Sequence, residues 1–499
     1  MIVSRFSSGT MRRLIPRVLI VLLMFSLTCG LRARLGGGGG YSGGGGGGGY
    51  SGGGGYSGGG GGYSGGGSVS DLSTREIACS LVFITVIVVG SLIRNNITEQ
   101  ESTVIARPPI LPPDWDDLRR YDANFSEVLF RDFAYSLFSK IHEARGSNHL
   151  QQCRQFLSDR AMKELEGMSV HTEDVYGVVV GALNVRIWER PSEAEDNIVV
   201  KLSFDANYTE VNSSREPPQA VYTYQVWYLS RKANVLSPAP DKITAFDCVG
   251  CGSAYEPAES GECGHCGKIY EPGKHHWKVD SVSELNRKNV GPALTSKAPD
   301  VGLNLQTVCD SNLERHRAQL IETYPDMDLQ MAFTRFQHIY HTLQKAWTEQ
   351  DLDQLRPFET DSLFQNHRYW VEEYQRQNLR NVLKDVRLDK LELVKIRSDK
   401  FYDAITCRLF ASMIDYTQNE NGKVLCGNTW KSTRFSEYWT FVRGRGASGN
   451  TKGDSVCPNC AAELKISMAG ECEYCGSKLT SGQFDWVLSE IQQDEEYAG

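Results

Sequence analysis

Apolar residues recur at helical spacing at the start of two long segments of the chain. In the first segment they are four residues apart and the pattern stops near Gly146, whereas in the second they are three or four apart. Such spacing places the apolar side chains on one face and predicts two amphipathic helices. The positions are Phe125, Leu129, Phe133, Leu137 and Ile141 in the first segment, and Phe333, Phe336, Tyr340, Leu343 and Trp347 in the second.

Three runs rich in β-branched and aromatic residues follow each predicted helix. They cover residues 175–188, 198–208 and 220–229 in the first segment, and 385–396, 404–416 and 435–442 in the second. Asn, Gly and Pro residues bound these runs, which is typical of strands joined by turns. Helices followed by consecutive strands predict the α+β class, with an antiparallel sheet that the helices cover.

The two segments are copies of one pattern. Residues 225–231 align with 437–443 at a shift of 212, and Leu150, Cys153, Phe156 and Asp159 align with Leu352, Leu355, Phe358 and Asp361 at a shift of 202. Two sets of four cysteines repeat at a shift of 209. Such internal similarity predicts a duplicated structural unit.

Each cysteine set has the form C-x2-C, eleven residues, C-x2-C, which suits a tetrahedral zinc ion held by two short turns. Gly252, Gly267 and Gly476 each follow the second cysteine of a pair, where a flexible backbone lets amide groups point at sulfur. We expect two structural zinc ions, one in each zinc ribbon. Their ligands are Cys248, Cys251, Cys263 and Cys266 in the first ribbon, and Cys457, Cys460, Cys472 and Cys475 in the second.

Disulfides, a redox C-x2-C pair and an iron-sulfur cluster are the alternatives for these cysteines. A four-sulfur zinc site has no open position for a water molecule, so the metal would stabilise the fold and would not catalyse. His275 and His276 follow the cysteines of the first ribbon and are interpreted as surface residues, because four sulfurs already complete the site.

Two apolar runs lie near the N-terminus. Residues 18–30 form a 13-residue run preceded by four arginines, which is typical of a secretory signal, and whether it is cleaved stays open. Residues 77–93 contain 17 residues without a charge, which as a helix would extend roughly 26 Å, at the short end for a membrane span. We interpret this run as a transmembrane helix; a buried core helix is the alternative. A mitochondrial or plastid presequence is the alternative for the N-terminus as a whole.

Glycine and charge are unevenly distributed. Residues 36–67 hold 24 of the 49 glycines together with four Tyr-Ser pairs, a composition that predicts a flexible tether. Residues 1–93 carry +7 −2 = +5, so the overall −8 leaves residues 94–499 at −13. Because nucleic-acid binding needs a basic face, we expect no nucleic-acid partner. A basic N-terminal end retained inside the cell places the large C-terminal part on the cytosolic side of the membrane.

The second segment, about residues 328–446, contains a distinctive set of motifs: the segment from Asn421 to Gly427, residues 435–443, Asp415 with Tyr416, and the helical start at 336–347 with Asp351. With these motifs the segment resembles the Tim44-like domain family. The first segment, about 117–232, keeps Trp227 and Arg231, but has Gln225 where the second has Glu437 and lacks the Gly-x-Val-x-x-Gly turn.

This resemblance implies a tandem of nuclear-transport-factor-two-like (cystatin-like) cones with an apolar cavity between helices and sheet. It also implies a peripheral, lipid-associated role of the kind described for bacterial relatives with a signal, a Gly-rich tract and a span. Tyr438, Trp439 and Phe441 are the candidate ligand contacts within the motif, and plain sheet packing is the alternative for them.

The predicted domains follow from these observations: a signal-like segment at 1–35, a tether at 36–76, the transmembrane helix at 77–93, a linker at 94–116, α+β domains at 117–236 and 328–446, zinc ribbons at 244–285 and 453–490, and a linker at 286–327 between the two halves. The last residues, from Asp494 onward, are predicted to be a frayed acidic end.

The sequence therefore predicts a membrane-anchored, non-enzymatic binding or tethering protein. Its expected partners are a membrane lipid, a membrane-protein client, or both, in transport or translocation. A cavity enzyme acting on a small molecule is one alternative, for which Asp403 or Asp415 would supply the polar pair. A zinc-ribbon adaptor that binds a protein partner is the other.

Overall fold

The computed structural model describes Pro113, residues 115–447 and residues 456–499. Gaps within these ranges are 147–148, 170, 192–195, 213–216, 234, 239, most of 241–275, 290–301 except Leu294, 495 and 498. The predicted signal-like segment, tether and transmembrane helix lie outside the described residues. Within the described part of the chain, no helix is both long and apolar enough to cross a membrane.

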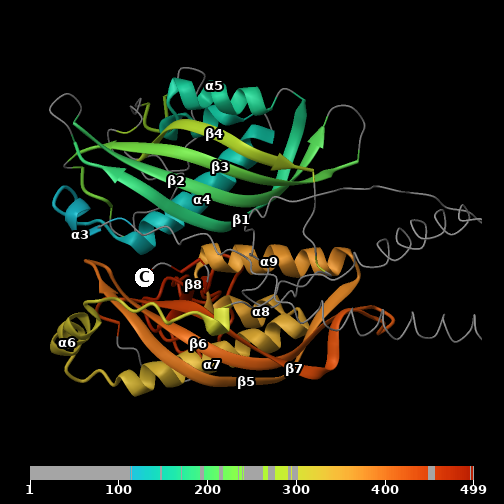
Figure 1. The fold of residues 1–499 in the computed structure, drawn as a ribbon. Helices are drawn as coiled ribbons and strands as arrows, with labels where there is room; N and C mark the ends of the chain where they lie inside the picture. The colour runs from blue at the N-terminus through green and yellow to red at the C-terminus, as the bar shows by residue number, and fades with distance from the viewer. Residues whose placement is uncertain are drawn as a thin grey trace, which may run out of the picture. The chain divides into compact units, whose positions relative to one another are not determined.

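The first half contains helices followed by a four-stranded antiparallel sheet (Figure 1). The sheet order is β1-β2-β3-β4, which is also the chain order. The helices are α3 (Trp115–Leu118), α4 (Glu127–Gly146), the 3-10 helix η2 (Leu150–Phe156) and α5 (Asp159–Met168), and the strands are β1 (Thr172–Glu189), β2 (Asn197–Asn212), β3 (Gln219–Lys232) and β4 (Lys278–Lys288).

The second half repeats this order of elements. Its sheet order is β5-β6-β7-β8 and all neighbouring strands are antiparallel. The elements are η4 (Gly302–Asn304), α6 (Leu313–Thr323), α7 (Leu329–Glu349), α8 (Leu352–Leu355), η5 (Arg356–Phe358), α9 (Asp361–Arg376), β5 (Leu379–Ser398), β6 (Tyr402–Asn419), β7 (Val424–Gly444) and β8 (Val487–Gln493). The predicted α+β class with antiparallel sheets is confirmed.

The long first strand of each sheet contains a β-bulge at an equivalent place. Gly177 has φ 62° beside the register shift between Tyr176 and Val179, and Asp385 has φ 50° between Lys384 and Arg387. A bulge of this kind bends the strand and increases its twist. The strong curvature of β5 around α7 is visible in Figure 1.

The long helix of each half packs on its sheet through aromatic side chains. In the first half Phe138 stacks on Phe204, with ring centroids 4.6 Å apart. In the second half Phe336 stacks on Phe441 at 3.9 Å, and Tyr340 contacts Trp439 at 5.4 Å. These contacts place the apolar core of each half between its long helix and its sheet.

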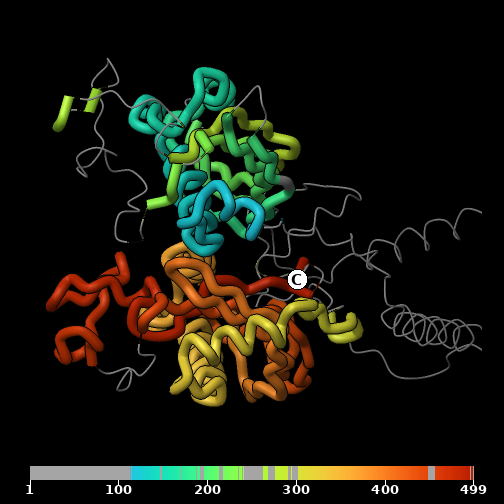
Figure 2. Tube along the Cα trace, turned by 90° about the vertical axis from the view of Figure 1, so that its left-hand side faces the viewer, coloured from blue at the N-terminus to red at the C-terminus, as the bar shows by residue number. Residues whose placement is uncertain are grey.

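Both cysteine-bearing segments lie between the third and fourth strands of a sheet, so that each is an insertion in a hairpin. β4 pairs with β3 and includes residues 278–285, which the sequence assigns to the first ribbon. β8 pairs with β7 and begins at Val487, within the predicted second ribbon. Each half is thus closed by a strand that returns to the sheet after the cysteines. Figure 2 shows the second cysteine-bearing segment in red beside its half.

The C-terminal segment differs from the predicted frayed end. Asp494 is 6% exposed and Tyr497 is 3% exposed. Arg408 on β6 pairs with Asp494 at 2.7 Å, and Tyr497 stacks on Tyr438 with ring centroids 3.8 Å apart. The prediction was wrong because composition alone does not show that one of these acidic residues, Asp494, neutralises a buried arginine.

Candidate metal centre

Two tight turns carry the four cysteines of the second set. An isolated bridge pairs Val456 with Glu463, and a second pairs Glu471 with Lys478. In the first turn the Ala461 amide donates to the Cys457 carbonyl at 2.9 Å. In the second turn the Gly476 amide donates to the Cys472 carbonyl at 2.8 Å. Each turn thereby places its two cysteines on the same side.

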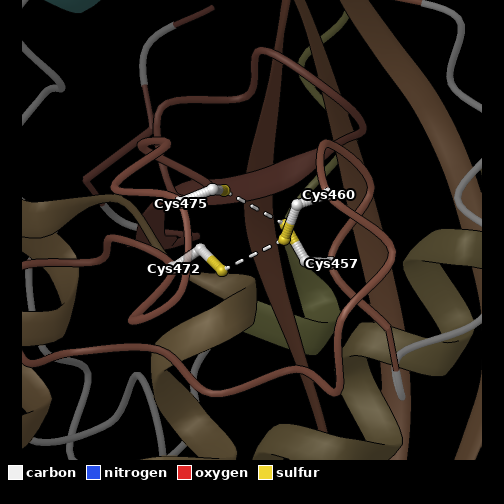
Figure 3. A group of neighbouring side chains, drawn as sticks. All are labelled: Cys457, Cys460, Cys472 and Cys475. Carbon is white, nitrogen blue, oxygen red and sulfur yellow. Dashed lines mark hydrogen bonds between the residues drawn. The ribbon is translucent and has the colours of Figure 1, made fainter.

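The four sulfur atoms converge on one point (Figure 3). All four lie within 4.8 Å of one another. The Sγ atoms of Cys457 and Cys475 are 3.8 Å apart, and those of Cys460 and Cys472 are 3.9 Å apart. A tetrahedron with zinc–sulfur bonds of about 2.3 Å has sulfur–sulfur edges of about 3.8 Å. The spacing therefore fits a four-sulfur metal site, and it is far longer than a disulfide bond.

The sulfur of Cys475 has polar neighbours that favour its thiolate. The Ser477 hydroxyl lies 3.4 Å and the Asn459 amide nitrogen 3.5 Å from this sulfur. Hydrogen bonds from Ser477 and Asn459 lower the pKa of Cys475 to about 6. Because a metal binds the thiolate, these contacts prepare the site for a cation near neutral pH.

Half of the first cysteine set lies within the described residues. Cys263 and Cys266 are described, whereas Cys248 and Cys251 lie outside the described residues. The Gly267 amide donates to the Cys263 carbonyl at 2.8 Å, and Gly267 has φ 65°. This turn repeats the geometry of the Cys472 turn. The four-cysteine cluster at Cys457 is the one found within the described part of the chain.

A buried arginine attaches the metal-binding segment to the helices of the second half. Arg356 is 1% exposed, and its guanidinium donates to the Met468 carbonyl at 2.9 Å and the Glu359 carbonyl at 3.2 Å. It also forms an ion pair with Asp361, the first residue of α9. Sequence reasoning missed this contact, although the shift of 202 aligns Arg356 and Asp361 with Arg154 and Asp159.

Residues of the second cysteine turn complete this contact. Lys478 Nζ lies 2.6 Å from the Asp361 carboxylate, and the Thr480 hydroxyl donates to it at 3.2 Å. Burial raises the pKa of Asp361, but the charges of Lys478 and Arg356 outweigh burial and hold that pKa below its ordinary value. We call Arg356, Asp361 and Lys478 the ribbon brace.

The predicted ligand residues do not form one site. Trp439 and Phe441 face α7 and are 0% and 1% exposed. Tyr438 faces the opposite side of the sheet, where Tyr497 covers it and where its hydroxyl accepts from the Val308 amide at 2.9 Å. The reason is the alternation of side chains along a strand, which separates position 438 from 439 and 441. All three side chains are buried in the sheet, and a ligand contact for any of them stays a prediction.

The two aspartates named for a cavity enzyme are both buried and both paired. Asp403 accepts from the Ser398 hydroxyl at 2.7 Å and faces Arg443 at 3.5 Å. Asp415 accepts from the Asn381 amide at 2.8 Å. Sequence reasoning missed a second buried polar pair, His367 with Glu359, whose Nδ1 and Oε1 atoms are 2.6 Å apart. No sequence motif marks this pair. Glu359 follows η5 and His367 lies on α9, and the two side chains meet only in the folded chain.

Comparison with known proteins gives a family match that lies within the second half. The family model of the Tim44-like domain matches residues 316–453. The match therefore begins within α6, includes β5 to β7, and ends before Cys457. The predicted resemblance of residues 328–446 is confirmed, and a second copy in the first half stays a prediction.

A solved structure described as an "Ntf2 like protein involved in plasmid conjugation" is similar at 9% sequence identity and a TM-score of 0.17. The alignment covers 74% of this chain and 97% of that chain. At this TM-score the likeness carries no structural argument. Among curated proteins, no sequence matches the chain.

Proposed function

We propose that this chain is a membrane-attached binding protein without catalytic activity. The observation that supports the proposal is the Tim44-like match on a half with one long helix packed on a curved antiparallel sheet. We assign both halves to the nuclear-transport-factor-two-like fold. In this proposal residues 77–93 span the membrane, the two halves lie on its cytosolic side, and they bind a lipid or a membrane-protein client during transport or translocation.

The membrane attachment is tested on the full chain in cells. Val86→Arg places a charge beside the centre of the apolar run, whereas Val86→Leu is the matched apolar control. We expect the arginine variant to be extracted from membranes by alkaline carbonate and the leucine variant to stay in them, because a central charge opposes insertion. External protease acting on intact cells should leave residues 115–499 uncut. Equal extraction of both variants, or external digestion of those residues, would contradict the proposal.

Binding is tested by native mass spectrometry of the full chain released from lipid nanodiscs. The proposal expects a lipid or a protein client to be retained in the released complex. A chain that carries neither, and that alters a small molecule during incubation, would favour the cavity enzyme instead. The buried polar residues Asp403 and Asp415 would then be substituted first.

We infer that each cysteine set holds one zinc ion with a structural role. The four-sulfur geometry at Cys457, Cys460, Cys472 and Cys475 supports one of the two ions. Elemental analysis of the full chain should give two zinc ions, with one lost in Cys472→Ser and one lost in Cys263→Ser. Two ions retained in both serine variants, or iron in place of zinc, would contradict this assignment.

A protein-adaptor role of the second ribbon is the second candidate. Tyr474, between two of the cysteines, is 57% exposed, and Met468 is 41% exposed. Exposed aromatic and methionine side chains are common at protein interfaces. If a captured client is lost in Tyr474→Ser while the lipid is retained, the ribbon is the client-binding element.

A further inference from the structure

The N-terminal part of β7 contains a bulge that presents one tryptophan. Tyr416 pairs with Gly427, and Ile414 pairs with Ser432, so that the four residues 428–431 lie opposite Asp415 alone. The Asn428 side-chain oxygen accepts from the Trp430 amide at 2.9 Å and from the Lys431 amide at 3.2 Å. These bonds hold the bulge in one conformation, with Trp430 near its middle.

Gly427 explains why the motif carries a glycine immediately before this bulge. Its φ is 85°, and a Cβ atom at this position would lie 2.3 Å from the Asp415 carbonyl oxygen. A side chain is therefore excluded by both backbone conformation and space. In the first half, β3 pairs with β2 from Gln219 to Lys232 without a register shift, so this described strand carries no bulge of this kind.

Trp430 is 77% exposed, the most exposed of the large apolar residues in the described part of the chain. Leu425 and Val424 on the same strand are 44% and 39% exposed. β8 pairs with residues 437–442 of β7 only, and no other described strand pairs with β7 on that side. An indole this exposed contributes little to the packing of this half.

The charges around Trp430 are opposite in sign to those of the rest of the folded chain. Residues 420–434 contain Lys423, Lys431 and Arg434 against Glu420, and Asp389 of β5 lies 3.7 Å from Arg434, which gives +3 −2 = +1 around the bulge. Residues 94–499 as a whole carry −13. The three basic residues are all exposed. A local cationic patch in an acidic protein is complementary to an anionic surface.

We propose that the bulge of residues 427–432 is a docking site for an anionic lipid bilayer, into whose interface Trp430 inserts. Indole rings partition to the boundary between headgroups and acyl chains, and neighbouring lysine and arginine residues are attracted to anionic headgroups. The inference rests on the proposed membrane attachment. The 21 residues between the apolar run and α3 reach at most roughly 70 Å, so the folded part of the chain begins within that distance of the same membrane.

The bulge also argues against a peptide strand as the occupant of this edge. Residues 428–431 interrupt the regular ladder, and bulges of this kind protect sheet edges from pairing with another strand. A strand added to β7 would need a continuous row of backbone donors and acceptors. The side chain of Trp430, not the strand edge, is the group that the bulge presents.

The test uses the full chain reconstituted into vesicles of phosphatidylcholine with about 30% phosphatidylglycerol, the anionic lipid. Acyl chains carry bromine, which quenches a nearby indole. The fluorescence of Trp430 is the difference between the wild type and Trp430→Phe. We expect it to fall at least twofold in these vesicles, and to stay unquenched in pure phosphatidylcholine and in the double variant Lys431→Glu with Arg434→Glu.

Leu285→Ala is the matched control, since Leu285 is 63% exposed on β4 of the other half, and it should leave the quenching unchanged. Flotation of each sample separates the two proposals. A chain that floats with vesicles while Trp430 stays unquenched overturns the docking site but keeps the membrane attachment. A chain that does not float contradicts the attachment itself. The inference is also overturned if a protein partner protects Trp430 from quenching by iodide while brominated lipid does not quench it.

Discussion

At the scale of single residues, the two turns of the metal centre differ at one equivalent position. Gly476 follows Cys475 with φ 69°, whereas Ala461 follows Cys460 with φ 58°. The left-handed region is unstrained for glycine and costs an L-residue roughly 1 kcal/mol. Glycine follows three of the four cysteine pairs. Ala461 adopts the left-handed conformation after the fourth pair, where its side chain makes that conformation strained.

Replacing Ala461 with glycine should stabilise the first turn by about 0.5–1 kcal/mol, because the backbone strain disappears. The reciprocal change, Gly476→Ala, should destabilise the second turn by a similar amount. Competition of the full chain with a zinc chelator measures both, since the folded turns bind the metal. Backbone strain at Ala461 is contradicted if the Ala461→Gly variant releases zinc more readily than the wild type.

The pH at which the metal leaves depends on Cys475. Without a bound metal its pKa is lowered to about 6, so the thiolate is present at neutral pH, and protons compete with the metal for this sulfur as the pH falls. Ser477→Ala removes the largest cause of the lowered pKa and should move zinc release to higher pH. A titration of bound zinc against pH reads this directly, and an unchanged midpoint would exclude a role for the hydroxyl.

At the scale of elements, the duplication provides two versions of one ion pair. Arg154 pairs with Asp159 at 2.6 Å, and its side chain is 43% exposed. Arg356 forms the equivalent pair with Asp361, but its side chain is 1% exposed and is covered by the metal-binding segment. The same two residue types therefore lie at the surface in one half and inside a contact between elements in the other.

Substitution of the two arginines by alanine should separate these roles. Arg356→Ala leaves buried carbonyl groups without a donor and should cost about 2–4 kcal/mol. Arg154→Ala removes an exposed pair and should cost less than about 1 kcal/mol. Denaturant unfolding of the full chain, followed by hydrogen exchange in α9 and α5, compares them. Equal losses in the two variants would contradict a structural role for the ribbon brace.

At the scale of the whole molecule, the C-terminal segment completes the second half. Arg408 is buried, and its guanidinium also donates to the Gly302 carbonyl at 2.8 Å and the Thr307 hydroxyl at 2.8 Å. It thereby joins β6, the segment before α6 and the C-terminal segment. Sequence composition alone gave no reason to connect three segments so far apart along the chain.

Loss of Asp494 should therefore destabilise the second half strongly. Asp494→Ala leaves the positive charge of Arg408 buried with one partner fewer, and we expect a loss of about 3–5 kcal/mol. Glu490→Ala is the control for removal of a nearby acid, and a smaller loss is expected because its carboxylate is 23% exposed. Thermal unfolding of the full chain measures both. A variant at Asp494 as stable as the wild type would restore the frayed end that the sequence suggested.

The sequence determined the elements whose signals are local. Apolar periodicity located α4 and α7, runs rich in β-branched and aromatic residues located β1 to β3 and β5 to β7, and cysteine spacing selected the residues that meet at the metal centre. These features depend on neighbours within a few turns of chain, so a single sequence records them. The Gly-x-Val-x-x-Gly motif likewise marked a real turn and bulge.

Only the tertiary structure decided the features that join distant residues. The return of β4 and β8 to their sheets made the cysteine segments insertions, and the burial of Arg356 and Arg408 gave them partners more than 80 residues away. Trp439 and Tyr438 were separated because strand geometry sends neighbours to opposite faces. Such contacts have no local signature, since their free energy comes from desolvation and packing that exist only once the chain has folded.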